Sequence, residues 1–317
     1  MKKLLKKIRS IEMLNQMVRL AIKHSTRGVT KLFDELQKWW PATGLVECEF
    51  KGIKFKMYNK SDDGLLYYFY YQVEYNEKAD LSLFIELAKS SSCILDIGAN
   101  TGLFSVLSSI SNPDSEIHAF EPYGVNADRL KMNLQANNLH NVIVNQEALG
   151  DMIGSIVISI PKDQSVTSVA SANHEFSKKI HPELEWETVE TAINTLDNYR
   201  KTLNRPIDLI KCDVETFEMS VFKGGYNMLA TDKPAIIFES FLDAERIDFF
   251  NGILKKFEYH LYLILQEGIV YSKDGFPEKN FGMNFLISPI KPTRNFISYD
   301  QTELIRNQIL MRPSLKA

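Results

Sequence analysis

The stretch "CILDIGANTGLFS", residues 93–105, decides the fold class of this chain. An apolar run ends at Ile97, a turn containing Gly98, Asn100 and Gly102 follows, and a second apolar run begins directly after it. We interpret this order as strand, turn and helix, because glycine accepts positive φ and lets a ligand approach the backbone closely. The free N–H groups at the start of such a helix face the carboxyl edge of the sheet.

Short apolar strands alternate with amphipathic helices from Ser90 onward, which is typical of a parallel α/β sheet with helices on both faces. We expect strands at residues 93–97, 116–120, 141–147, 207–213, 235–239, 260–265 and 284–289, and helices at residues 101–111, 124–137 and 215–228. A polar insertion at about residues 155–200 has ends that indicate a β ribbon, and we expect it near the ligand crevice.

The first 89 residues form a separate N-terminal region before a domain over residues 90–317. A hairpin is predicted around Lys51 and Gly52, because both flanking segments alternate apolar and polar residues. Before it, apolar residues recur at helical spacing from Leu4 to Leu36, with Lys and Arg between them. We expect this helix to pack on its own domain or on a partner subunit of a homo-oligomer; peripheral contact with a membrane surface is the alternative.

Composition limits the classes of partner and compartment. With 37 basic and 40 acidic residues the net charge is −3, so no overall field attracts nucleic acid. We find no apolar run suited to a signal peptide or a membrane span and expect a cytoplasmic protein. Cys48, Cys93 and Cys212 lie far apart, so we expect buried thiols in a reducing compartment and neither a disulfide nor a zinc site.

The turn after the first strand differs from the dinucleotide fingerprint. That fingerprint needs G-x-G-x-x-G for a pyrophosphate, whereas here the order is D-x-G-x-N-x-G with Asp96 on the strand itself. A carboxylate there repels a pyrophosphate and attracts an ammonium or sulfonium group. Glu121 ends the next strand, where an acid can accept ribose hydroxyls, and Tyr123 could lie against an adenine. S-adenosylmethionine has these parts.

Residues 90–289 resemble the FkbM-type S-adenosylmethionine-dependent methyltransferases. The resemblance rests on ordered blocks: "LDIGANTGLFS", "AFEPYGVNADRLKMNLQANNL", "ALGD", "VETAINTLDNY", "IDLIKCDVETFEMSVFKGGYNML", "PAIIFE" and "GMNFLIS". It implies a Rossmann-like class I methyltransferase sheet of seven strands, with the last strand antiparallel, and S-adenosylmethionine as the cofactor. The chain departs from the family at Thr216, where the family has glycine; either this turn is an ordinary helix entry or the local pocket differs.

The same resemblance assigns the donor-binding residues. The methionine part would be lined by the strand end and turn, the ribose by the acid after the second strand, and the adenine by residues after the second and third strands. In that order the residues are Asp96, Gly98, Asn100 and Gly102; Glu121; and Tyr123, Glu147 and Ala148. Thr101 and Pro122, in the same blocks, are also predicted to bind the cofactor. Asp213 would close the methyl-donor side.

Methyl transfer to a hydroxyl requires alignment of donor and acceptor and removal of a proton. Asp213, Glu215 and Glu239 are the candidate bases, with Asp213 or Glu215 favoured. Glu215 could instead cap the following helix, and Glu239 could instead hold backbone. A divalent cation bound by these acids is a less favoured alternative, and we predict no metal site. Among the histidines, we expect His118 inside the sheet and His174 and His181 on the surface of the insertion.

The leading hypothesis is an enzyme, an O-methyltransferase. The resemblance implies a hydroxyl of a small molecule or glycan, sugar or polyketide-like, as the acceptor. A nucleotide-sugar or dinucleotide enzyme is one alternative, disfavoured by Asp96 and the missing glycine spacing. A non-catalytic domain that binds a partner through its aromatic N-terminal region is another.

Overall fold

The computed structural model describes residues 12–25, 40, 42–60, 64–71, 79–162, 178–179, 181–277 and 284–310. The chain forms two compact units, Met1–Tyr75 and Asn76–Ala317. The division precedes residue 89, where we placed it from the sequence. Helix α5 (Ala79–Ala88) belongs to the larger unit because it packs on α6 (Leu103–Ser111) and α13 (Thr302–Ile309).

The smaller unit contains a hairpin of β1 (Gly44–Phe50) and β2 (Ile53–Asn59). Its two-residue turn has positive φ at both Lys51 and Gly52, the geometry that matches the twist of paired strands. Helix α4 (Gly64–Tyr71) packs on β1, with the ring of Phe69 5.2 Å from that of Phe50. The helix expected from Leu4 to Leu36 is described as α2 (Glu12–Ser25); its remainder lies outside the described residues.

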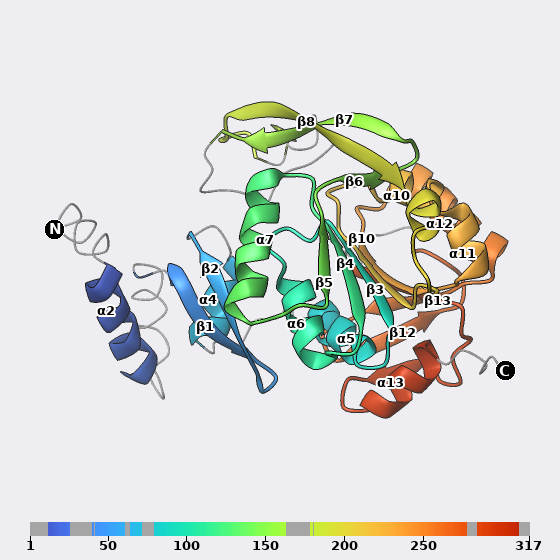
Figure 1. Ribbon diagram of the computed structural model, residues 1–317. Helices are drawn as coiled ribbons and strands as arrows, with labels where there is room; N and C mark the ends of the chain where they lie inside the picture. Colours follow the sequence, from blue (N-terminus) through green and yellow to red (C-terminus); the bar gives the residue numbers. More distant parts are fainter. Residues whose placement is uncertain are drawn as a thin grey trace. The chain divides into compact units, whose positions relative to one another are not determined.

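The larger unit is built on a mixed nine-stranded sheet (Figure 1) with the order β14-β12-β11-β13-β10-β9-β3-β4-β5. The seven expected strands are β3 (Cys93–Ile97), β4 (Glu116–Phe120), β5 (Val142–Asn145), β9 (Leu209–Cys212), β10 (Ala235–Glu239), β11 (His260–Ile264) and β13 (Asn284–Ser288). The last of these runs antiparallel to both its neighbours, so the predicted class I arrangement is confirmed. Two further strands, β12 (Gly268–Ser272) and β14 (Phe296–Ser298), extend one edge.

Apolar residues from alternate positions of the strands fill two cores, one on each face of the sheet. One core contains Phe84 of α5 and Ile305 of α13. The other contains Phe222 of α10 (Glu218–Lys223), Leu229 of α11 (Tyr226–Thr231) and Phe250 of α12 (Ala244–Phe257). Helix α7 (Gly124–Ala136) contacts β5.

The single helix predicted over residues 215–228 is wrong, because the structure has the short helices α10 and α11 there. The helix is interrupted at Gly224 and Gly225, between α10 and α11. A Cβ atom on Gly224 would lie 1.8 Å from the carbonyl oxygen of Gly150 in β6 (Ala148–Gly150). This close approach between distant segments fixes the break.

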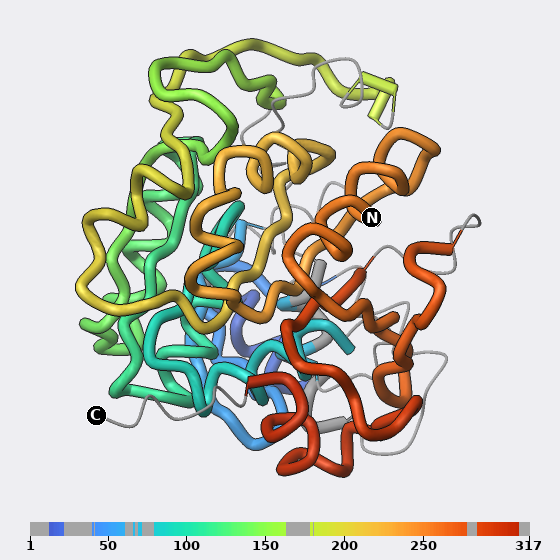
Figure 2. The backbone as a smooth tube through the Cα atoms, turned by 90° about the vertical axis from the view of Figure 1, so that its right-hand side faces the viewer, coloured from blue at the N-terminus to red at the C-terminus, as the bar shows by residue number. Residues whose placement is uncertain are grey.

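The insertion forms the predicted β ribbon. Strands β7 (Gly154–Pro161) and β8 (Trp186–Thr195) pair antiparallel along their length, and β6 adds a third strand. Figures 1 and 2 both show this ribbon at one end of the larger unit, beyond the sheet. The middle of the insertion, residues 163–177 and 180, lies outside the described residues. Helix α9 (Leu196–Arg200) leads from β8 back to the sheet.

All three cysteines are buried, as predicted. Burial raises the pKa of the Cys93 thiol to about 12 and also raises the pKa of Cys212. Among the helices that the structure describes, none combines the length and apolar character needed to cross a bilayer.

Candidate active site

The turn after β3 is held against two neighbouring strands. The amides of Gly98 and Ala99 both donate to the carbonyl of Phe120, at 3.0 and 2.9 Å. Gly98 has φ +78°, and a Cβ atom built on it would lie 1.9 Å from the carbonyl oxygen of Asp213. This position therefore needs glycine for the close approach of the chain after β9, and the turn lies directly beside Asp213.

Two polar groups of the turn are buried. Asp96 is 2% exposed and accepts a 2.6 Å hydrogen bond from the Ser105 hydroxyl. Burial raises the pKa of Asp96 to about 6. Asn100 has φ +51°, and its buried Oδ1 has no hydrogen-bond partner among the described residues. A buried carbonyl oxygen without a donor is costly, so this atom fits a site for a cationic or N–H-bearing ligand group.

Glu121 joins this turn to the one after β4. Its carboxylate accepts hydrogen bonds from the backbone amides of Asn100 and Tyr123, at 2.8 and 2.9 Å. The side chain is almost fully buried, and burial raises its pKa to about 7. A further hydrogen bond comes from the Asn126 side chain. The contact of Glu121 with a ribose stays a prediction and has to be made beside these bonds.

The other predicted donor-binding residues lie where the ribbon meets the sheet. Tyr123 is buried against Ile158 and Ile160 of β7. The carbonyl of Pro122 accepts a 3.4 Å hydrogen bond from Thr191 of β8. The structure thus places the ribbon against the turn after β4.

Two predicted adenine-binding residues, Glu147 and Ala148, lie in the chain between β5 and the ribbon strands β7 and β8. Glu147 is half-buried; burial raises its pKa, while a hydrogen bond from Asn194 of β8 opposes that rise. Ala148 begins β6 and pairs with Ile193. In the turn before α6, the carbonyl of buried Thr101 accepts a hydrogen bond from Asn133 of α7 at 2.7 Å. The adenine contacts assigned to this region stay predictions.

Sequence reasoning missed Lys211, the cation at the centre of the acidic residues. It lies on β9 opposite Asp96 of β3, is 2% exposed, and has its Nζ 3.0 Å from Oδ2 of Asp213. Its Nζ also lies 4.9 Å from the ring centre of Phe104. Burial alone would lower the pKa of Lys211, but the negative charges of Asp213 and Asp80 raise it above its ordinary value.

The three candidate bases come together around this lysine. Burial and the charge of Asp213 raise the pKa of Glu215 to about 7 and that of Glu239 to about 8. Lys211 opposes both shifts, so it lies within electrostatic reach of each carboxylate. Glu239 pairs in register with Asn284 of β13, whose buried Oδ1 has no partner among the described residues. Several acids with raised pKa values at one sheet edge mark a candidate catalytic site.

The turn after β9 is strained. Glu215 has φ +51° and Thr216 has φ +78°, so the interpretation of this turn as an ordinary helix entry is wrong. Thr216 keeps a conformation that suits glycine, at a cost of about 1–2 kcal/mol. The carboxylate of Glu218 holds the turn by accepting from the amides of Val214 and Thr216, each at 3.2 Å. Because α10 begins at Glu218, Glu215 lies outside its first turn.

The histidines lie apart from this cluster of acids. His118 is 2% exposed, with its ring nitrogens 2.8 Å from the Tyr199 hydroxyl and 2.9 Å from Glu116, so its predicted place inside the sheet is confirmed. His181 lies beside Glu183 at 3.2 Å, and His174 is outside the described residues. Within the described ranges, no group of three or more His, Cys, Asp or Glu side chains is arranged to hold a metal ion.

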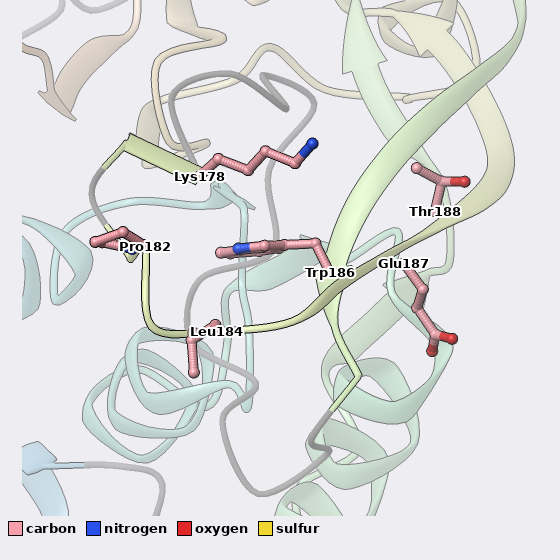
Figure 3. A pocket seen from close by; sticks show the side chains of 6 residues that line it. All are labelled: Lys178, Pro182, Leu184, Trp186, Glu187 and Thr188. Carbon is pink, nitrogen blue, oxygen red and sulfur yellow. The ribbon is translucent and has the colours of Figure 1, made fainter.

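A pocket of about 520 Å³ lies at the far end of the ribbon. Figure 3 shows the indole of Trp186 reaching from β8 toward Pro182, with Lys178 and Leu184 on opposite sides of the ring in this view. Its lining residues are Lys178, Pro182, Leu184, Trp186, Glu187 and Thr188. Glu187 lies close enough to Tyr123 to contribute to the raised pKa of that phenol, after burial. Glu187 also pairs in register with Ile160 of β7, which packs on Tyr123.

Comparison with known proteins identifies relatives of this chain. The family model described as "Methyltransferase FkbM domain" matches residues 96–264, from the buried acid of β3 to the end of β11. A curated relative, "Methyltransferase 1" of Beauveria bassiana (strain ARSEF 2860), is 26% identical over 147 residues. That alignment covers 42% of this chain and 58% of the relative's length.

Two solved structures are also similar. The FkbM methyltransferase of Methylobacillus flagellatus KT aligns with a TM-score of 0.38 and 16% identity over 62% of this chain and 43% of its own. A methyltransferase from Streptococcus mutans in complex with SAH aligns with a TM-score of 0.39 and 11% identity over 68% of this chain and 96% of its own.

Proposed function

We propose that this chain, which belongs to the FkbM family of S-adenosylmethionine-dependent methyltransferases, transfers the methyl group to a hydroxyl and is therefore an O-methyltransferase. The observation that carries the proposal is the group of carboxylates around Lys211, directly beside the glycine turn. Glu215 and Glu239 have pKa values of about 7 and about 8, which suit removal of a hydroxyl proton near neutral pH.

The residues of the turn fit the charged end of S-adenosylmethionine. The unsatisfied Oδ1 of Asn100 can accept from an ammonium group, and the buried carboxyl of Asp96 favours a positively charged ligand. When bound, this cofactor supplies an activated methyl group. Gly98 places the turn against Asp213, so a donor held by the turn and an acceptor held by the acids would be neighbours.

The sequence alone favours Asp213 or Glu215 as the base, but the contacts of the three acids lead us to favour Glu239. The carboxylate of Asp213 is already engaged by the ammonium of Lys211, with Nζ 3.0 Å from Oδ2. Glu239 lies at the end of β10 opposite Asn284, whose amide oxygen has no partner among the described residues and can accept a hydrogen bond from an acceptor hydroxyl. In this arrangement Lys211 and Asp213 are positioning residues, and the proton of the acceptor passes to Glu239.

Amide substitutions test this assignment. Glu239→Gln is expected to lower methyl transfer by about 10²–10⁴-fold, while binding of S-adenosylmethionine is retained. Asp213→Asn and Glu215→Gln are expected to have smaller effects. The assay follows the transfer of labelled methyl groups from S-adenosylmethionine to two kinds of test acceptor, methyl glycosides and β-hydroxy esters. Treatment of the product with mild alkali then distinguishes stable methyl ethers from labile methyl esters. Near-normal transfer by all three variants, or an alkali-labile product, would contradict the proposal.

We also propose that the acceptor is glycan-like and enters over the ribbon. The pocket combines the flat apolar face of Trp186 with the charged groups of Lys178 and Glu187, and sugars present apolar ring faces beside hydroxyls. Trp186→Ala is expected to raise the acceptor KM about tenfold or more and to leave the donor Kd unchanged. Val157→Ala, on an exposed site of the same ribbon, is the matched control. An unchanged acceptor KM in the Trp186 variant would exclude this path.

A further inference from the structure

Helix α2 of the smaller unit turns its polar side inward. Asn15 and Arg19, one turn apart, are each 4% exposed. The amide of Asn15 donates to the Thr43 hydroxyl at 3.1 Å, and Arg19 donates to the Thr43 carbonyl at 2.8 Å. The Arg19 guanidinium also lies 5.5 Å from the ring centre of Tyr70 in α4. These contacts fix the rotation of the helix about its axis.

The opposite side of α2 carries large apolar side chains in contact with solvent. Met13 is 74% exposed and Met17 is 62% exposed, and they are one helical turn apart. Leu20 and Leu14 flank them at 43% and 38% exposure. Four neighbouring large apolar side chains on one helix face form a contiguous patch, which marks an interaction site. We call Met13, Leu14, Met17 and Leu20 the α2 stripe.

The sequence around the α2 stripe is strongly basic. Residues 1–27 contain eight basic residues and one acidic residue, although the whole chain has a net charge of −3. The basic residues are Lys2, Lys3, Lys6, Lys7, Arg9, Arg19, Lys23 and Arg27, and the acidic residue is Glu12. Arg19 is the buried side chain that bonds to Thr43, so it does not add to the charge that a partner of the α2 stripe would meet. An apolar helix face in a basic segment has the composition of helices that lie in the interface of an anionic membrane.

We propose that the α2 stripe docks on an anionic lipid surface and holds the enzyme there. A second copy of the chain fits the patch less well, because it would bring the same basic segment against the first. The stripe is also small: a helix of 14 residues is about 21 Å long, whereas a stable protein interface uses about 20–30 residues from each partner. An anionic bilayer offers an apolar interior to the α2 stripe and negative charge to the basic segment.

Vesicle flotation of the full-length protein tests the proposal. The vesicles are phosphatidylcholine alone or phosphatidylcholine with about 30% phosphatidylglycerol. We expect the bound fraction to be several-fold higher on the anionic vesicles and to fall when salt is raised from about 50 to about 500 mM. Met17→Ser with Leu20→Ser, which leaves the charge unchanged, is expected to reduce the partition coefficient about tenfold or more.

The control carries the same kind of change on the larger unit. Met132 and Val157 are 45% and 55% exposed, so Met132→Ser with Val157→Ser removes exposed apolar groups outside the α2 stripe. It is expected to bind anionic vesicles as the unchanged protein does, and thermal unfolding verifies that both variants fold. The proposal would be overturned by equal binding of the unchanged protein to both vesicle types, or by an equal loss of vesicle binding in both double variants. It would also be overturned if light scattering showed a dimer that the Met17 and Leu20 double variant abolishes.

Discussion

Gly98→Ala tests whether the turn after β3 is shaped by its contact with the end of β9. At Gly98 the backbone has φ +78°, and an added Cβ would lie 1.9 Å from the carbonyl oxygen of Asp213. The carbonyl cannot move away freely, because the amide of Asp213 donates to the carbonyl of Ile97 at 3.0 Å. The substitution therefore meets both backbone strain and overlap.

The expected cost follows from these two effects. A non-glycine residue in the left-handed region costs about 1–2 kcal/mol. Forcing an extra carbon into a packed site costs about 1–3 kcal/mol. Together they predict that Gly98→Ala lowers the free energy of unfolding by roughly 2–5 kcal/mol, a large part of the total for most domains.

Urea unfolding followed by circular dichroism measures this difference. Gly252→Ala is the matched control, because Gly252 lies inside α12 with no atom within 4 Å of an added Cβ. There alanine is expected to stabilise by about 0.5–1 kcal/mol through its helix propensity. An unfolding free energy for Gly98→Ala within about 0.5 kcal/mol of the unchanged protein would refute the reasoning.

Three further predictions concern the acids and the strained turn. Lys211→Met leaves Asp213 without its cation. Because 36% of the Asp213 side chain is exposed, we expect the free energy of unfolding in urea to fall by only about 1–2 kcal/mol, and we expect methyl transfer to be at least tenfold slower. Unchanged activity would show that Lys211 does not belong to the site. The pKa of Glu239 is raised from 4.5 to about 8 in the folded protein, so between these values the folded state holds more protons and stability falls as pH rises. Thermal unfolding between about pH 5 and about pH 8 should therefore depend less steeply on pH in Glu239→Gln, and parallel curves would count against a buried Glu239. Thr216→Gly relieves the strain at φ +78° and should stabilise by up to about 1 kcal/mol; a lower melting temperature would show that the threonine side chain contributes more than the strain costs.

Much of the sheet could be predicted because its strands are buried and clearly punctuated. The bounds expected for β3, β4 and β10 agree with the structure, since each is a short apolar run that ends in a turn. The break between α10 and α11 was missed, because it depends on contact between Gly224 and the distant Gly150. The edge strands β12 and β14 are short, and their pairing gave no separate signal in the sequence.

The acids of the candidate site could also be predicted from the sequence, whereas the lysine among them was not. Asp213 and Glu215 follow β9, and Glu239 ends the neighbouring strand β10, so topology alone brings them to one edge. Lys211 was overlooked, although a lysine within an apolar strand is a signal, because buried lysines are rare unless they are paired. The open amide oxygens of Asn100 and Asn284 depend on how loops and strands close around them, which no local pattern contains.

The central claim is that the turn from Asp96 to Gly102 binds S-adenosylmethionine, and calorimetric titration of the full-length protein with S-adenosylmethionine and, separately, with NAD tests it most directly. We predict saturable binding of S-adenosylmethionine with a stoichiometry of one per chain, weakened about tenfold or more by Asn100→Ala, and no binding of NAD. Binding of NAD without binding of S-adenosylmethionine would contradict the account.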